Sequence, residues 1–93
     1  MTIDALARSA SLMHQIVSTC ATGFDVDADL AARAEKAFLQ AGEKLYGSAT
    51  FDAAVAAELQ RRADEARTTG SDRWCADQRE RLRGVPGQKI FRK

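Results

Sequence analysis

Two cysteines, Cys20 and Cys75, offer the widest choice of chemistry in this sequence of 93 residues. They can form a disulfide, stay buried as free thiols, bind zinc or supply a reactive nucleophile. A zinc site needs two further Cys or His ligands, but His14 is the only histidine. A reactive thiol needs a nearby base. His14 lies in the wrong part of the helix expected for residues 3–21 to act as the base for Cys75. We favour the disulfide, with two buried free thiols as the main alternative.

Three aspartates, Asp25, Asp27 and Asp29, alternate along the chain as they do in a calcium-binding loop. The EF-hand pattern needs a glycine and a bidentate glutamate at two later positions, where Leu30 and Lys36 stand instead. Three carboxylates in the first turn of a helix complement the helix dipole. We therefore expect these aspartates to have a structural role.

The single histidine, His14, shares its face of the expected helix with Ser11 and Ser18. This setting predicts an exposed histidine rather than a general base. The sequence contains no Ser-His-Asp order, glycine-rich phosphate loop or paired-carboxylate signature. We therefore predict a non-enzymatic protein with no catalytic residue, no metal site and no cofactor.

Four helices are predicted by the spacing of the apolar residues. Apolar side chains recur at intervals of three and four residues in four segments, and a glycine follows each segment. Abundant Ala, Glu, Arg and Leu also favour helices over sheets. We expect Ser48 or Thr50 to cap the third helix and Ser71 to cap the fourth. The expected helices cover residues 3–21, 27–46, 50–68 and 72–83.

Short connections favour antiparallel neighbours, so the four helices are expected to run up, down, up and down. Cys20, at the end of the first helix, and Cys75, at the start of the fourth, then lie at the same end of the bundle. A disulfide between them would close a loop of about 55 residues and stabilise the fold by roughly 4 kcal/mol in the chain-entropy model. We predict one all-α domain over residues 1–85, a small four-helix up-and-down bundle stapled by this disulfide.

The core of such a bundle must be small, because much of the apolar content is alanine. The large side chains on the inward faces are expected to fill it. They are Leu6, Met13, Val17, Leu30, Phe38, Leu45, Phe51, Val55, Leu59, Trp74 and Leu82.

A disulfide points to an oxidising compartment, so we expect a periplasmic or secreted protein, with a cytoplasmic location as the alternative. No apolar stretch approaches the roughly 18 to 20 residues that span a bilayer. The first 17 residues lack the basic segment and uninterrupted apolar segment of a signal peptide, which by itself leaves secretion open.

Charge is distributed unevenly along the chain. Residues 1–60 carry four Lys or Arg and eight Asp or Glu, a net charge of −4, whereas residues 61–93 carry ten basic and five acidic residues, a net charge of +5. A basic segment of this kind attracts an anionic partner or complements the acidic half of the fold. Acidic residues at helical spacings among the arginines favour instead a solvated, salt-bridged face. The candidates for binding a partner or an anion are Arg79, Arg83, Lys89, Phe91 and Arg92.

The tail, residues 86–93, places two large apolar side chains, Ile90 and Phe91, among three cations after the helix-breaking Pro86. Burying both side chains would be worth roughly 3 to 5 kcal/mol, which is enough to order a short segment. We predict that the tail docks with Phe91 as its anchor, on its own bundle or else on a second copy or partner.

These observations predict a small non-enzymatic helical binding or interaction protein of an extracytoplasmic compartment, with a protein partner or a second copy of itself. The alternative is a cytosolic regulatory or nucleic-acid-associated protein that uses the basic C-terminal third. Asp72, Asp77 and Glu80 in the fourth expected helix disfavour contact with nucleic acid.

Overall fold

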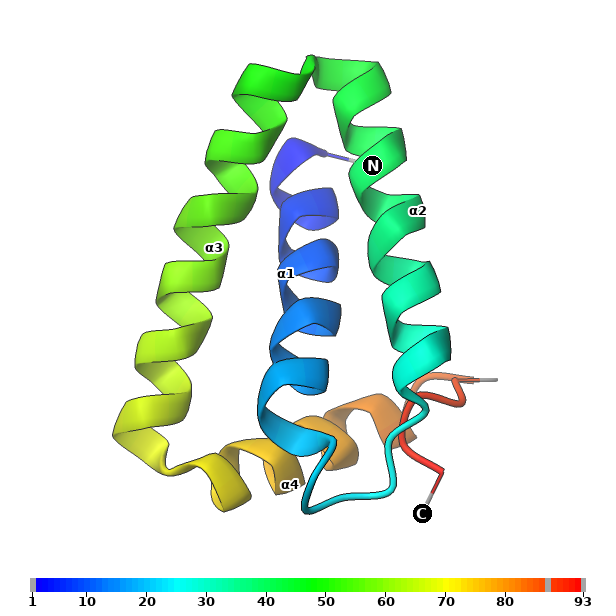
Figure 1. Cartoon of the computed structure of the whole chain (residues 1–93), viewed down its shortest axis with the longest axis vertical. Coiled ribbons are helices and arrows are strands. Elements are labelled where there is room, and N and C mark those ends of the chain that lie inside the picture. Colours follow the sequence, from blue (N-terminus) through cyan, green and yellow to red (C-terminus); the bar gives the residue numbers. More distant parts are fainter. Residues whose placement is uncertain (1, 87, 93) are drawn as a thin grey trace.

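The computed structural model describes residues 2–86 and 88–92, and four helices account for most of them. This confirms the predicted all-α fold of four helices (Figure 1). The helices are α1 (Ile3–Cys20), α2 (Ala28–Tyr46), α3 (Ser48–Thr69) and α4 (Ser71–Arg83).

Side-chain hydrogen bonds cap the N-termini of the first two helices. The Thr2 hydroxyl accepts a hydrogen bond from the Ala5 N–H at 3.1 Å, and Asp27 Oδ1 accepts one from the Leu30 N–H at 3.0 Å. Each bond satisfies a backbone donor that has no partner within its helix. Asp27, one of the three alternating aspartates, therefore fixes the point at which α2 begins.

Single glycines connect the other helices, which corrects the predicted caps of α3 and α4. Gly47 and Gly70 occupy the N-cap positions with φ of 86° and 96°, and neither helix has a side-chain cap. Ser48 and Ser71 are instead the first helical residues. A one-residue reversal between two helices needs a positive φ, which glycine adopts without steric cost.

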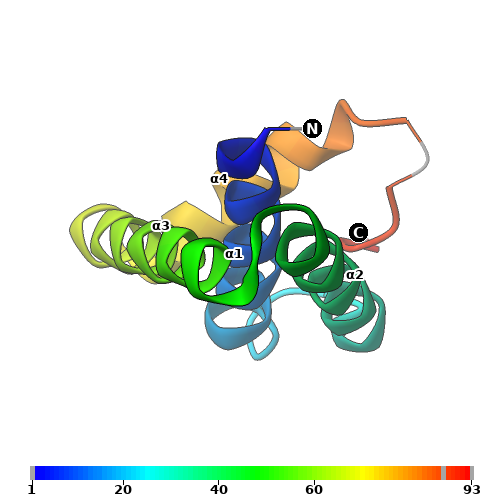
Figure 2. The same ribbon diagram turned by 90° about the horizontal axis from the view of Figure 1, so that it is seen from above.

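The first three helices alternate in direction, and α1 lies between α2 and α3 (Figure 1). In an up-and-down bundle the fourth helix would run antiparallel to the third. Here α4 instead runs across the base of the other three helices. It packs against α1 and α3. With 13 residues against 18 to 22 in the others, α4 is too short to run their full length. Figure 2 shows the segment after α4 returning to the side of α2.

Two clusters form the core. The larger one lies toward the base and joins residues of α1, α4, the loop before α2 and the tail, among them Ile16, Val26, Trp74 and Phe91. The smaller one is built on Leu6, Ala7 and Phe51, between α1 and the α2–α3 hairpin. Of the predicted core, Leu6, Met13, Phe51 and Trp74 are buried. Val17, Leu30, Phe38, Val55, Leu59 and Leu82 are partly buried.

Leu45 is the one predicted core residue that the structure places in solvent, with 65% of its surface exposed. Its position continues the apolar stripe of α2, which is why the spacing predicted burial. The last turn of α2, however, rises above the start of α1 (Figure 1). Because α1 does not extend to that height, it does not cover Leu45, and the prediction for Leu45 was wrong.

Candidate functional site

Cys20 and Cys75 form the predicted disulfide between the end of α1 and the first turn of α4. Their Cα atoms lie 5.7 Å apart, and at most 1% of either residue is exposed. Neither thiol is therefore free to act as a nucleophile or a zinc ligand. Among the described residues, no group of three or more His, Cys, Asp or Glu side chains could hold a metal ion.

His14 lies exposed, as predicted, with its Nδ1 atom 3.1 Å from Glu35 Oε2 on α2. Its ring therefore joins the outer surfaces of two helices. The aspartates before α2 serve separate purposes, since Asp27 caps the helix while Asp25 forms an ion pair with Arg92 of the tail. The structural role expected for the aspartates fits these contacts.

The C-terminal tail docks on its own bundle, as predicted. Val26 and Phe91 face each other in an antiparallel bridge, in which the Asp27 N–H donates to the Ile90 carbonyl at 2.8 Å and the Arg92 N–H donates to the Asp25 carbonyl at 2.9 Å. Ile90 and Phe91 are only 7% and 6% exposed. The tail is thus a part of the main core, with Phe91 as an anchor.

Aromatic contacts tie the tail to the loop and to α4. The rings of Phe24 and Phe91 meet edge to face with their centroids 6.3 Å apart. The Arg79 guanidinium carbon lies 5.2 Å from the centroid of the Phe24 ring, within the range of a cation–π contact. Arg79 Nε is shielded from solvent and has no hydrogen-bond partner. Arg79 therefore supports the docked tail, rather than presenting its whole guanidinium to a partner.

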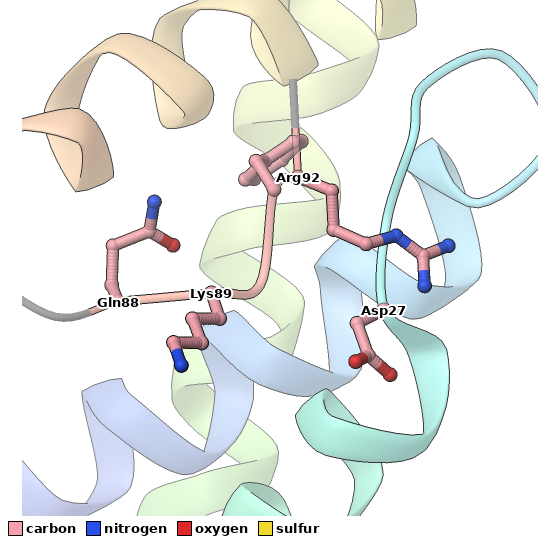
Figure 3. Close-up of a pocket in the computed structure, with 5 residues that line it drawn as sticks. Asp27, Gln88, Lys89 and Arg92 are labelled. Atoms are coloured by element: carbon pink, nitrogen blue, oxygen red, sulfur yellow. The ribbon is translucent and has the colours of Figure 1, made fainter.

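A shallow pocket of about 290 Å³ opens where the tail meets the start of α2 (Figure 3). It includes three of the five predicted binding candidates. The fourth, Arg79, stacks on Phe24, and the fifth, Arg83, is an exposed residue paired with Glu80 at 3.0 Å. The residues that line the pocket are Asp27, Gln88, Lys89, Phe91 and Arg92.

Most polar groups of this pocket are already engaged. Arg92 Nε donates to Asp25 Oδ1 at 2.9 Å, and Gln88 Oε1 accepts from the Ile90 N–H at 3.0 Å. Asp27 holds the first turn of α2. In contrast, no carboxylate of the described residues lies within ion-pair distance of Lys89. The Lys89 ammonium is therefore the pocket's uncommitted charge.

Three arginines of the basic C-terminal third form ion pairs along their own helices. Arg61 pairs with Glu58 and Glu65 one turn away, and Arg67 pairs with Asp64. These pairs match the solvated, salt-bridged face that the spacing of the charges favoured. The positive charge of this third is thus partly offset by acidic residues on the same helices.

One residue of this basic set is buried, which the sequence analysis missed. Arg62 is 8% exposed, and its Nε–H donates to the fully buried Ser11 hydroxyl at 3.2 Å. Burial is the main cause that lowers the pKa of Arg62, and the neighbouring positive charge of Arg61 adds to it. A signal was present, since position 62 follows Phe51 and Val55 at helical intervals of eleven and seven residues.

Comparison with known proteins adds no assignment to this geometry: no protein-family model matches the chain, and no curated protein or solved structure is significantly similar to it. Within the described residues, no helix has both the length and the apolar character needed to cross a membrane. Function is therefore inferred from the contacts of the chain itself.

Proposed function

We propose that this chain is a small non-enzymatic helical binding protein of a periplasmic or secreted compartment, and that it binds a protein partner at the pocket beside its C-terminal tail. The observation that carries the proposal is the pocket itself. It combines Lys89, for which no described carboxylate lies within ion-pair distance, with a tail backbone that is hydrogen-bonded in place. A cation on an ordered backbone suits recognition of a negatively charged side chain.

The disulfide supports the proposed compartment. Disulfides persist mainly where the surroundings are oxidising, and small secreted domains use them because their cores are limited. Here the disulfide lies inside the larger core cluster, beside Trp74 and Ile16. We therefore take the oxidised, cross-linked form as the native state of the protein.

The pocket's own chemistry supports binding over catalysis. Its carboxylate, Asp27, caps α2 through one oxygen, and its amide, Gln88, accepts a hydrogen bond from the backbone of the tail. A general acid or base must be free to exchange a proton with a bound substrate. Lys89 and Arg92 offer N–H donors that can fix a negatively charged group in place.

Photo-crosslinking in the cell of origin tests the proposal. A photoreactive amino acid replaces Gln88 at the pocket, and a matched variant carries it at Gln40, an exposed position on α2. We expect a discrete crosslinked protein from position 88, none from position 40, and recovery of the product outside the cytoplasm. The proposal fails if both positions give the same products or none. It also fails if the chain stays in the cytoplasm and binds DNA or RNA with an affinity that falls steeply with salt.

A further inference from the structure

The pocket shows which charge its occupant should carry. Two of its charged residues already face opposite charges or dipoles, because Arg92 pairs with Asp25, and the carboxylate of Asp27 lies at the positive end of the α2 dipole. Lys89 has no such compensation among the described residues. An occupant that brings a negative charge would complete the arrangement.

The surroundings of Lys89 indicate what else this occupant must offer. In Figure 3 the Lys89 amine and the Asp27 carboxylate lie on the same side of the tail, and no ion pair joins them. Asp27 Oδ1 accepts from the Leu30 N–H, which leaves the other carboxylate oxygen able to accept a further hydrogen bond. A peptide residue can supply both groups, a carboxylate for Lys89 and a backbone N–H for Asp27.

The size of the pocket agrees with a short peptide segment. A volume of about 290 Å³ is at the lower end of the range for small-molecule sites, so it holds one or two side chains rather than a large cofactor. Phe91 also lines the pocket, but only 6% of its surface is exposed, so it leaves little apolar surface for an occupant. The feature that an occupant can use is therefore the charge of Lys89, which an acidic side chain matches.

Resting on the proposed function, we propose that the pocket binds an acidic side chain, Asp or Glu, in an extended segment of the partner. Lys89 is the residue that selects the negative charge. Because the tail forms the wall of the pocket, the occupant also contacts the segment that closes the base of the fold.

Titration with short blocked peptides, followed through the backbone amide signals of residues 88–92, tests the assignment. The probes are acetyl-Leu-Glu-Leu-amide, its Gln counterpart, and the Gln peptide with a free C-terminal carboxylate. We expect the Glu peptide to bind roughly three- to tenfold more tightly than the blocked Gln peptide, the range for a partly exposed charge-assisted contact. Equal binding of the two blocked peptides would overturn the assignment. So would preference for the free terminus, or displacement of the Glu peptide by equimolar succinate.

Charge variants separate the role of Lys89 from general attraction. Lys89→Met keeps the length of the side chain and should abolish the preference for Glu, whereas Lys36→Met, at an exposed position on α2, should leave it unchanged. Lys89→Glu should reverse the preference toward the corresponding Lys peptide. If all three variants keep the preference for Glu, another group binds the acid and the assignment is wrong. If crosslinking at position 88 captures a partner but the peptides show no preference for Glu over Gln, only this inference is wrong. If the pocket prefers the Glu peptide but crosslinking captures no partner, the proposed function is wrong.

Discussion

The two ends of the molecule are closed in different ways. At the base, the disulfide, the Val26–Phe91 bridge and the stack of Arg79 on Phe24 join α1, α4, the loop and the tail. At the apex, the end where α2 turns into α3, one glycine makes the connection, and Phe51 packs against Gly42 across the hairpin. The base is held by several links, whereas the apex is held by close packing of neighbours.

Sequence separation explains this difference. The segments that meet at the base are up to 67 residues apart, as in the pair of Asp25 and Arg92. Bringing such segments together costs chain entropy that local contacts do not recover. The helices at the apex are consecutive, so their encounter costs little and a well-fitted ring is enough. Each prediction below acts on one end and should leave the other end largely unchanged.

Removing the disulfide should have the largest effect. We expect the Cys20→Ala, Cys75→Ala double variant to lose about 4 kcal/mol of unfolding free energy, because the cross-link spans 55 residues of sequence. Urea unfolding measures the loss. Hydrogen exchange should accelerate first at the Asp27 and Arg92 amides, which the tail protects. Equal acceleration at the apex, or an unchanged unfolding midpoint, would show that the base does not depend on this link.

Removing the anchor of the tail should be the next largest effect. Phe91→Ala leaves a void beside Phe24 and Val26, and we expect a loss of about 3 kcal/mol, at the low end for such a truncation because the tail can undock locally. Val85→Ala is the matched control, since Val85 is 49% exposed and its truncation should change stability little. Thermal unfolding compares the two. Equal melting temperatures for both variants would mean that the tail contributes no stability.

Several features of the base follow from the sequence. The position of Cys20 in the last turn of one helix and Cys75 in the first turn of another was enough to pair them, because the alternating directions of α1, α2 and α3 bring the end of α1 and the start of α4 to the same end of the fold. Phe91 was identifiable as an anchor because a large ring is costly to leave in water. The surface that receives Phe91 was not predictable. It is formed by a bridge between the backbones of the loop and the tail, and no local pattern records such a pairing.

The apex shows the limits of reasoning from helical spacing. The spacing assigns Leu45 to a face, but whether that face is covered depends on how far the neighbouring helix extends. Reasoning from charge alone counted Arg62 among the surface cations, although its helical spacing from Phe51 and Val55 puts it over the buried Ser11. For the pocket, Lys89, Phe91 and Arg92 were chosen by residue type. Asp27 joins them only through the docking of the tail.

At the apex, adding one methyl group should destabilise the hairpin. An alanine side chain at Gly42 would overlap the ring of Phe51, which is fully buried and cannot move aside. We expect Gly42→Ala to cost about 1 to 3 kcal/mol by overpacking, even though alanine favours a helix by about 1 kcal/mol. Gly23→Ala is the control, because nothing lies within 4 Å of the added atom. If Gly42→Ala is as stable as the native chain, the ring does not hold the apex in the way described.

The smallest expected effect comes from two carboxyl groups at the apex. Glu43, on α2, shares a hydrogen bond with Asp52, on α3, and this bond together with the repulsion between the two groups raises the pKa of Glu43 above its usual value of 4.5. The folded chain therefore binds this proton more tightly than the unfolded chain does. The repulsion destabilises the fold at neutral pH, and stability is regained as the pH falls through the raised pKa toward 4.5.

Replacing either carboxyl group should remove this pH dependence. Glu43→Gln supplies an amide that donates to the Asp52 carboxylate without a charge, so we expect higher stability at pH 7 and a gain that shrinks on acidification. Asp52→Asn should act in the same direction, and the double variant should gain less than the sum of the two, because both act on one contact. Urea unfolding at neutral and mildly acidic pH measures these differences. A loss of stability at pH 7 in both single variants would mean that the Glu43–Asp52 pair stabilises the apex. The apex would then also be held by a specific link between side chains, as the base is.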